Sequence, residues 1–135
     1  MTALRLALLK GLDVRIITPE LNDNWFVKNA ARVYLSELSQ LGARIYYYKK
    51  GFMHQKVMLL DDNISIVGTV NFDNRSFRLN FEVSAAVADR EFAQQVDAML
   101  REDIGNSREL IDYRLQDQPV WDRLKAHGAA LLAPV

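Results

Sequence analysis

A histidine and a lysine two residues apart, His54 and Lys56, are the side chains of this sequence best suited to chemistry on a phosphate. They lie in the apolar, β-prone run HQKVMLLD, and on a strand two side chains at this spacing leave the same face. An imidazole can act as a nucleophile or carry a proton, and a neighbouring ammonium can hold an anionic oxygen. The pair predicts half of a phosphodiester-cleaving site, because the other histidine, His127, lies far away in the sequence.

Further polar residues follow this pair at fixed positions. Asp61 ends the run HQKVMLLD, and six residues later the run GTVN supplies Gly68, Thr69 and Asn71. The pattern H-x-K-x-x-x-x-D followed by G-[S/T]-x-N is the signature of the phospholipase D superfamily, which the chain resembles. The continuation NFDNRSFRLNFEV is similar to the second such motif of bacterial cardiolipin synthases. The resemblance spans nearly the whole chain, from GLDVRIITPE through DREFAQQVDAML to VWDRLKAHGAALLAPV.

The resemblance implies an enzyme, a phospholipase D-type phosphatidyltransferase that turns two phosphatidylglycerol molecules into cardiolipin and glycerol. In this superfamily two such motifs meet, from two halves of one chain or from two subunits. One histidine attacks phosphorus and forms a phosphohistidine, while the other protonates the leaving alcohol and deprotonates the incoming one. Because the motif resembles the second of the pair, we expect His54 to be the acid and base, with the nucleophile as its alternative role.

The same resemblance implies which residues form the site. Lys56 and Asn71 hold the non-bridging phosphate oxygens, assisted by Thr69, where the family usually has serine. Glu82 matches a buried glutamate that accepts a hydrogen bond from the imidazole and fixes its orientation. The expected catalytic residues are therefore His54, Lys56, Asn71 and Glu82.

Other motif residues are expected to support the fold. Asp61 and Gly68 belong to this group, together with Arg75 and Ser76. For Arg75 and Ser76 two interpretations remain open, as turn and capping residues or as residues that shape the pocket. No metal ion and no cofactor are expected, because lysine and polar donors neutralise the phosphate and the sequence has no cluster of metal ligands.

The composition limits the other classes of function. The chain has 135 residues, half of them hydrophobic, which suffices for a single domain over residues 1–135. Lys plus Arg balance Asp plus Glu at 17 each, so no global positive field favours nucleic acid as a partner. The absence of cysteine excludes disulfides and thiolate chemistry. No run approaches the roughly 20 apolar residues of a transmembrane helix, and no signal peptide is recognised.

The pattern of apolar residues predicts alternating helices and strands. Helices are expected over residues 2–10, from Asp23 or Asn24 to Gly42, from Asp89 to about 104, and over 119–135. Strands are expected over 13–20, 43–49, 54–61, 64–68 and 81–88, with a hairpin turn at 61–63 and an irregular polar stretch at 106–118. This order predicts an α/β fold, a mixed sheet with helices on both faces. A first strand of that sheet is expected upstream of Met1.

The C-terminal helix allows two interpretations. Trp121, Lys125 and several aliphatic residues suit contact with a membrane interface. Packing of the same stripe on the domain itself also explains them and is the favoured interpretation.

Three hypotheses about function follow. The first is the C-terminal half of a cardiolipin synthase-like enzyme, peripheral at the bacterial cytoplasmic membrane, with a phospholipid substrate and a second motif from the N-terminal region or another subunit. The second is a homodimeric phosphodiesterase or nuclease of the same superfamily, in which each chain contributes one His54. The third is an inactive, truncated half that acts as an interaction module.

Overall fold

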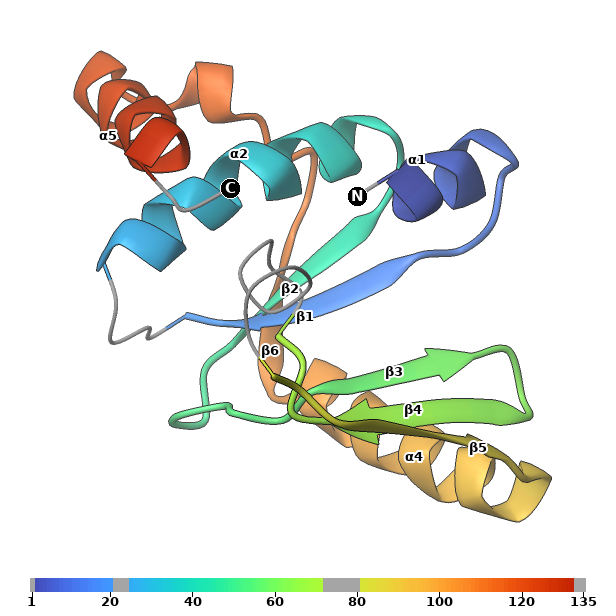
Figure 1. Ribbon diagram of the computed structural model, residues 1–135. Helices are drawn as coiled ribbons and strands as arrows, with labels where there is room; N and C mark the ends of the chain where they lie inside the picture. Colours follow the sequence, from blue (N-terminus) through green and yellow to red (C-terminus); the bar gives the residue numbers. More distant parts are fainter. Residues whose placement is uncertain (1, 21–24, 72–80, 133–135) are drawn as a thin grey trace. The chain divides into compact units, whose positions relative to one another are not determined.

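The computed structural model describes residues 2–20, 25–71 and 81–132, and these form two compact units. The first unit takes in Met1–Phe52 and Asn106–Ala133, and the second takes in Met53–Gly105. Figure 1 shows the helices and strands of each unit.

The first unit is built on a three-stranded mixed sheet with the order β1-β2-β6. Strand β1 (Arg15–Pro19) runs parallel to β2 (Arg44–Tyr48), and β2 pairs antiparallel with β6 (Ser107–Leu110). The helices are α1 (Thr2–Leu9), α2 (Trp25–Gln40) and α5 (Val120–Leu132), with a 3₁₀ turn at Leu115–Asp117. After α2, Gly42 takes a φ of 102°, a conformation that favours glycine and turns the chain into β2.

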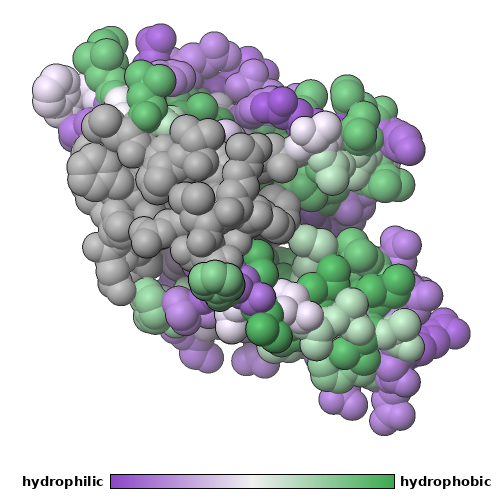
Figure 2. Space-filling view, viewed as in Figure 1, coloured by the Kyte–Doolittle hydropathy of each residue, from purple (hydrophilic) through white to green (hydrophobic). Residues whose placement is uncertain are grey.

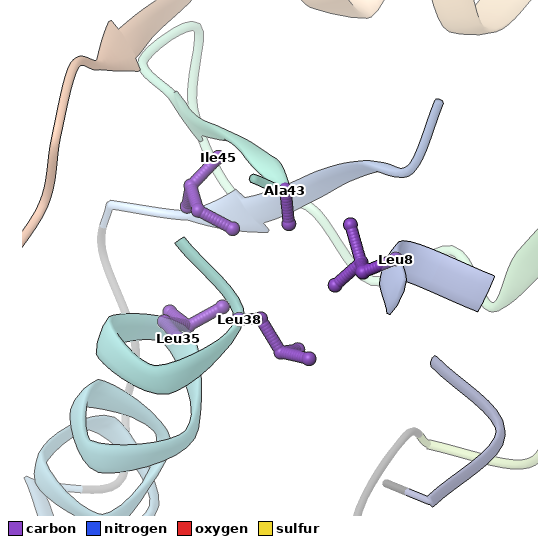
Figure 3. Close-up of a cluster of buried hydrophobic side chains, with 5 residues drawn as sticks. All are labelled: Leu8, Leu35, Leu38, Ala43 and Ile45. Atoms are coloured by element: carbon purple, nitrogen blue, oxygen red, sulfur yellow. The ribbon is translucent and has the colours of Figure 1, made fainter. Parts of the chain in front are cut away.

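Five buried side chains form the core of the first unit, which Figure 3 shows. They come from α1, α2, β2 and the residue before β2: Leu8, Leu35, Leu38, Ala43 and Ile45. Ile45 is completely buried and Leu38 is 2% exposed. Leu35 and Leu38 lie one helical turn apart, so α2 turns one apolar face toward the sheet.

The second unit is an antiparallel meander with one helix. Strands β3 (Val57–Leu60), β4 (Ile64–Gly68) and β5 (Ser84–Ala88) pair in that order, and α4 (Arg90–Gly105) packs against β3 and β4. Asp89 precedes α4, and its carboxylate accepts a hydrogen bond from the backbone N–H of Phe92 at 2.7 Å. This is the N-cap contact expected of an aspartate at a helix start.

The α/β class, with a mixed sheet and flanking helices, is confirmed, and so are the strands and helices expected from apolar periodicity. Three details of the prediction are wrong. Strands β3 and β5 begin at Val57 and Ser84, three residues later than expected. The strands divide between two sheets, and the polar stretch 106–118 contains strand β6. β6 escaped recognition because it pairs with β2 alone and exposes Arg108 and Glu109, so its sequence shows no apolar alternation. The N-cap residues Asp23 and Asn24 lie outside the described residues, and the single domain over residues 1–135 stays a prediction.

Candidate active site

All of the described motif residues lie in the second unit, around the β3–β4 hairpin. Residues 61–63 form the predicted turn between these strands, and Asp61 has a φ of 52° there. Aspartate tolerates this left-handed conformation better than most residues. Asp61 is separated from Lys56 by the whole of β3, roughly 13 Å for four residues. Its position in the turn agrees with a supporting role and gives it no place beside the reacting groups.

His54 and Lys56 precede β3, so the prediction that both lie on a strand is wrong. The physical reason is the length of the partner strand, because β4 ends at Gly68, opposite Lys56. One further backbone bond joins the two segments, from Gly68 N–H to the Lys56 carbonyl at 3.2 Å. The two side chains are therefore not constrained by strand geometry to leave one face.

The Lys56 side chain turns back toward the histidine. Its Nζ donates a hydrogen bond to the backbone carbonyl of His54 at 2.9 Å. The contact holds the ammonium near the His54 backbone, and the His54 side chain is exposed. A positive charge next to an accessible imidazole is the combination that a phosphate diester requires.

Gly68 is a glycine because β5 passes close to it. A Cβ at this position would lie 2.6 Å from the Ser84 Cα and would also overlap the Val83 carbonyl oxygen. The close approach allows Thr69 N–H to donate to the Val83 carbonyl at 2.9 Å. Gly68 thus brings the motif and the segment that carries Glu82 into contact.

Thr69 and Glu82, thirteen residues apart, are joined by a side-chain hydrogen bond in which the Thr69 hydroxyl donates to the Glu82 carboxylate. The same hydroxyl oxygen accepts the N–H of Val83 at 3.0 Å. A hydroxyl has one proton, so in this arrangement Thr69 holds Glu82 and has no proton left for a phosphate oxygen. The Glu82 side chain is partly exposed, whereas the resemblance implied a buried glutamate.

The remaining predicted residues are less constrained. Asn71 is exposed at the end of the segment after β4. Arg75 and Ser76 lie outside the described residues. His127 belongs to α5 of the first unit, where it is exposed. Within the described ranges, no three His, Asp or Glu side chains gather as metal ligands would.

One contact beside the motif could not be read from the sequence. The Gln55 side chain, between His54 and Lys56, donates a hydrogen bond to the Asp103 carboxylate near the end of α4. This bond ties the segment before β3 to the helix. Neither residue belongs to the motif, and nothing in their spacing of 48 residues indicates a contact.

The arrangement can support chemistry on a phosphate diester. His54 offers an exposed imidazole, Lys56 a fixed positive charge, and Asn71 an exposed amide, while the Thr69–Glu82 pair supplies an anchored carboxylate. A double displacement needs both a nucleophile and a general acid and base, and a single imidazole can fill one of these two roles.

Comparison with known proteins gives consistent results. Residues 1–104 match the family model of the cardiolipin synthase PLD-like domain. The chain is 44% identical over 133 residues to cardiolipin synthase A of Pseudomonas putida, and 42% identical over 134 residues to the probable cardiolipin synthase YwiE of Bacillus subtilis. These matches cover 98% and 99% of this chain, but 28% and 27% of the relatives, so the chain spans little more than a quarter of their length.

A solved structure shows the same fold. The crystal structure of a phospholipase D family member, Nuc from Salmonella typhimurium, matches with a TM-score of 0.73. The match covers 82% of this chain and 72% of that chain at 19% sequence identity. The motif, the fold and the family model agree, and the chain belongs to the cardiolipin synthase PLD-like domain family of the phospholipase D superfamily.

Proposed function

We propose that this chain supplies one half of the site of a cardiolipin synthase-type phosphatidyltransferase. The observation that carries the proposal is the His54–Lys56 contact and the Thr69–Glu82 contact, linked by the Gly68–Lys56 backbone bond, in a chain 44% identical to a cardiolipin synthase. A second H-x-K-x-x-x-x-D half comes from the rest of a longer chain or from another subunit. The substrate is a phospholipid of the phosphatidylglycerol type.

The proposed reaction has two displacements. In the first, the nucleophilic histidine of the other half bonds to phosphorus, and the bond between phosphorus and the headgroup glycerol breaks. His54, as acid, gives that glycerol oxygen its proton. In the second, His54 takes the proton from a hydroxyl of another phosphatidylglycerol, whose oxygen bonds to phosphorus as the phosphohistidine bond breaks. The products are glycerol and cardiolipin, and no metal or cofactor takes part.

The other residues stabilise charge and geometry. Lys56 and Asn71 hold the non-bridging oxygens as the phosphorus becomes five-coordinate, and one such preorganised donor contributes about 3–4 kcal/mol. Glu82, held by Thr69, orients the His54 imidazole. Asp61, Gly68, Arg75 and Ser76 support the loop that carries these groups.

We place the complete protein at the bacterial cytoplasmic membrane, where its substrate lies, with this chain peripheral to the bilayer. The balance of 17 basic and 17 acidic residues favours a lipid over a nucleic acid partner. Among the helices that the structure describes, none has the length and apolarity needed to span a bilayer.

The test is a graft. This chain replaces the matched 133-residue segment of the Pseudomonas putida relative, and the purified chimera is given phosphatidylglycerol vesicles. We expect cardiolipin and glycerol in equal amounts, and neither product after His54→Ala. Glycerol with phosphatidic acid in place of cardiolipin would indicate hydrolysis. A folded chimera without products, or a His54→Ala chimera that keeps them, would overturn the proposal.

Assays of the isolated chain distinguish between the two possible origins of the second half of the site. Cardiolipin formation by the chain alone, lost in His54→Ala, indicates that two copies build the site. Activity confined to the graft indicates that the second motif belongs to a longer chain. Cleavage of nucleic acid by the isolated chain, suppressed by salt, would favour the phosphodiesterase hypothesis instead.

A further inference from the structure

Helix α5 has two apolar faces, and its packing explains one of them. Ala126 is completely buried and Ala129 is 2% exposed, where α5 packs against α2. Four large apolar side chains remain exposed by between 59% and 84%: Val120, Trp121, Leu124 and Leu131. Packing on the domain therefore explains one side of this helix, and the other side is apolar and exposed.

The exposed residues form one stripe. At 100° per residue, Val120, Trp121, Leu124 and Leu131 fall within an arc of about 100°, and Ala126 and Ala129 fall on the opposite side. Figure 2 shows apolar side chains at the surface over α5, at the upper left of the view. A stripe of this kind on a 13-residue helix is typical of a helix that lies in the plane of a lipid interface.

The charges around the stripe favour one kind of partner. Arg123 and Lys125 border the stripe on its two sides, and the Lys125 ammonium lies 5.8 Å from the centre of the Trp121 ring. The one carboxylate of α5, Asp122, lies on the side of the buried alanines. Basic groups beside an indole and leucines, with the carboxylate turned away, suit an anionic lipid surface.

The position of Asp122 is supported by its neighbours on the packed side. It pairs with Lys125 at 3.6 Å. Burial lowers the pKa of Arg32 on α2, but its hydrogen bond to the Tyr113 hydroxyl and the nearby Asp122 carboxylate raise it overall. Asp122 therefore lies near cations on the packed side of α5, and the outer side carries no carboxylate of this helix.

We propose that the stripe formed by Val120, Trp121, Leu124 and Leu131 is a docking surface for an anionic phospholipid bilayer, with Arg123 and Lys125 contacting the headgroups. The proposal rests on the proposed function in one respect, that the substrate lies in such a bilayer. It assigns to the first unit the task of holding the protein at the lipid surface, separate from the chemistry of the second unit.

Fluorescence of Trp121 tests the proposal on the full chain. The chain has two tryptophans, so Trp25→Phe leaves Trp121 as the single reporter. We expect a blue shift with vesicles of equal parts phosphatidylglycerol and phosphatidylcholine, and quenching when the acyl chains carry bromine. Vesicles of phosphatidylcholine alone should give a much weaker shift. Absence of a shift with the anionic vesicles would overturn the proposal.

Variants separate the apolar and the charged contributions. Leu124→Ser and Leu131→Ser should each lower the vesicle partition coefficient about tenfold, because each removes a leucine from the lipid contact. Arg123→Gln should lower it about fivefold and reduce its dependence on salt. The matched control is Ile111→Ser, 83% exposed but outside α5, which should leave binding unchanged.

Two further outcomes would contradict the proposal. If Trp121 shifts with protein concentration in the absence of vesicles, and Leu124→Ser prevents this, the stripe binds a second copy of the chain. If RNA causes the shift and vesicles do not, the partner is a nucleic acid. His54→Ala is expected to bind vesicles normally, so loss of catalysis and loss of docking are told apart.

Discussion

The two units of this protein differ in how they use buried side chains. Of the twelve buried hydrophobic residues among those described, ten belong to the first unit and two, Ala93 and Val96, to the second. The most buried residue of the β3–β4–β5 sheet is Ser65, whose hydroxyl has no hydrogen-bond partner in the described part of the chain. The second unit carries the motif instead, on exposed or half-buried residues joined by hydrogen bonds.

This difference indicates that stability and chemistry depend on separate sets of residues. Substitutions in the first unit should act on the free energy of unfolding, and substitutions at the motif should act on the rate. Substitutions at the junction of β4 and β5 should act on both, because the motif is held there by backbone contacts.

The largest effect on stability is expected from the core of the first unit. Ile45→Ala removes a completely buried side chain and should lower the free energy of unfolding by about 2–5 kcal/mol. Urea denaturation followed by circular dichroism measures the change. The control is Leu9→Ala in α1, 70% exposed, for which about 0.5 kcal/mol or less is expected. Equal losses in the two variants would contradict the assignment of the core.

An effect of similar size, but on rate, is expected at Lys56. Lys56→Gln should slow glycerol release by the grafted enzyme about 10²–10³-fold, because a preorganised cation at the phosphate is lost. The free energy of unfolding should change by about 1 kcal/mol or less, since the Lys56–His54 hydrogen bond is exposed. Lys50→Gln, an exposed lysine outside the motif, serves as the matched control and should retain full rate. A normal rate in Lys56→Gln would remove this residue from the site.

Gly68→Ala should affect both quantities. The added methyl group overlaps backbone atoms of Val83 and Ser84, which cannot move without breaking the Thr69–Val83 contact. The free energy of unfolding should therefore fall by about 1–3 kcal/mol. The rate should fall as well, because Thr69 and Glu82 are displaced. Gly128→Ala in α5 meets open space and should instead stabilise the chain by about 0.5–1 kcal/mol. If both alanines stabilise, the close approach at Gly68 is wrong.

The smallest effect is expected from the Thr69 hydroxyl. Thr69→Ser keeps the hydrogen bonds to Glu82 and Val83 and should behave as the parent. Thr69→Val removes them and should lower the free energy of unfolding by about 1 kcal/mol. Nuclear magnetic resonance can follow the His54 ring, since the chain has two histidines. We expect Thr69→Val and Glu82→Gln to change the chemical shifts of the same His54 ring resonances in the same direction, with no further change in the double variant. Independent, additive shifts would assign Thr69 to the phosphate instead.

The sequence predicted the family and the fold class better than it predicted the contacts around the motif. The spacing from His54 to Asn71 identifies the superfamily, and the turn at Asp61 follows from local residue preferences. The pairing of Thr69 with Glu82 and of Gln55 with Asp103 depends on tertiary contacts that no local pattern encodes. His54 was placed on a strand because its neighbours favour β-structure, but β4 ends at Gly68, opposite Lys56, and β3 begins only at Val57.

The separation of chemistry from stability has one direct test, glycerol release from phosphatidylglycerol vesicles expressed per folded molecule. In the grafted enzyme, His54→Ala should reduce this rate by at least about 10²-fold while the free energy of unfolding stays within about 0.5 kcal/mol. Ile45→Val should lower the free energy by about 0.5–1.5 kcal/mol and leave the rate per folded molecule unchanged. A His54→Ala enzyme that still releases glycerol at the parental rate would contradict the account.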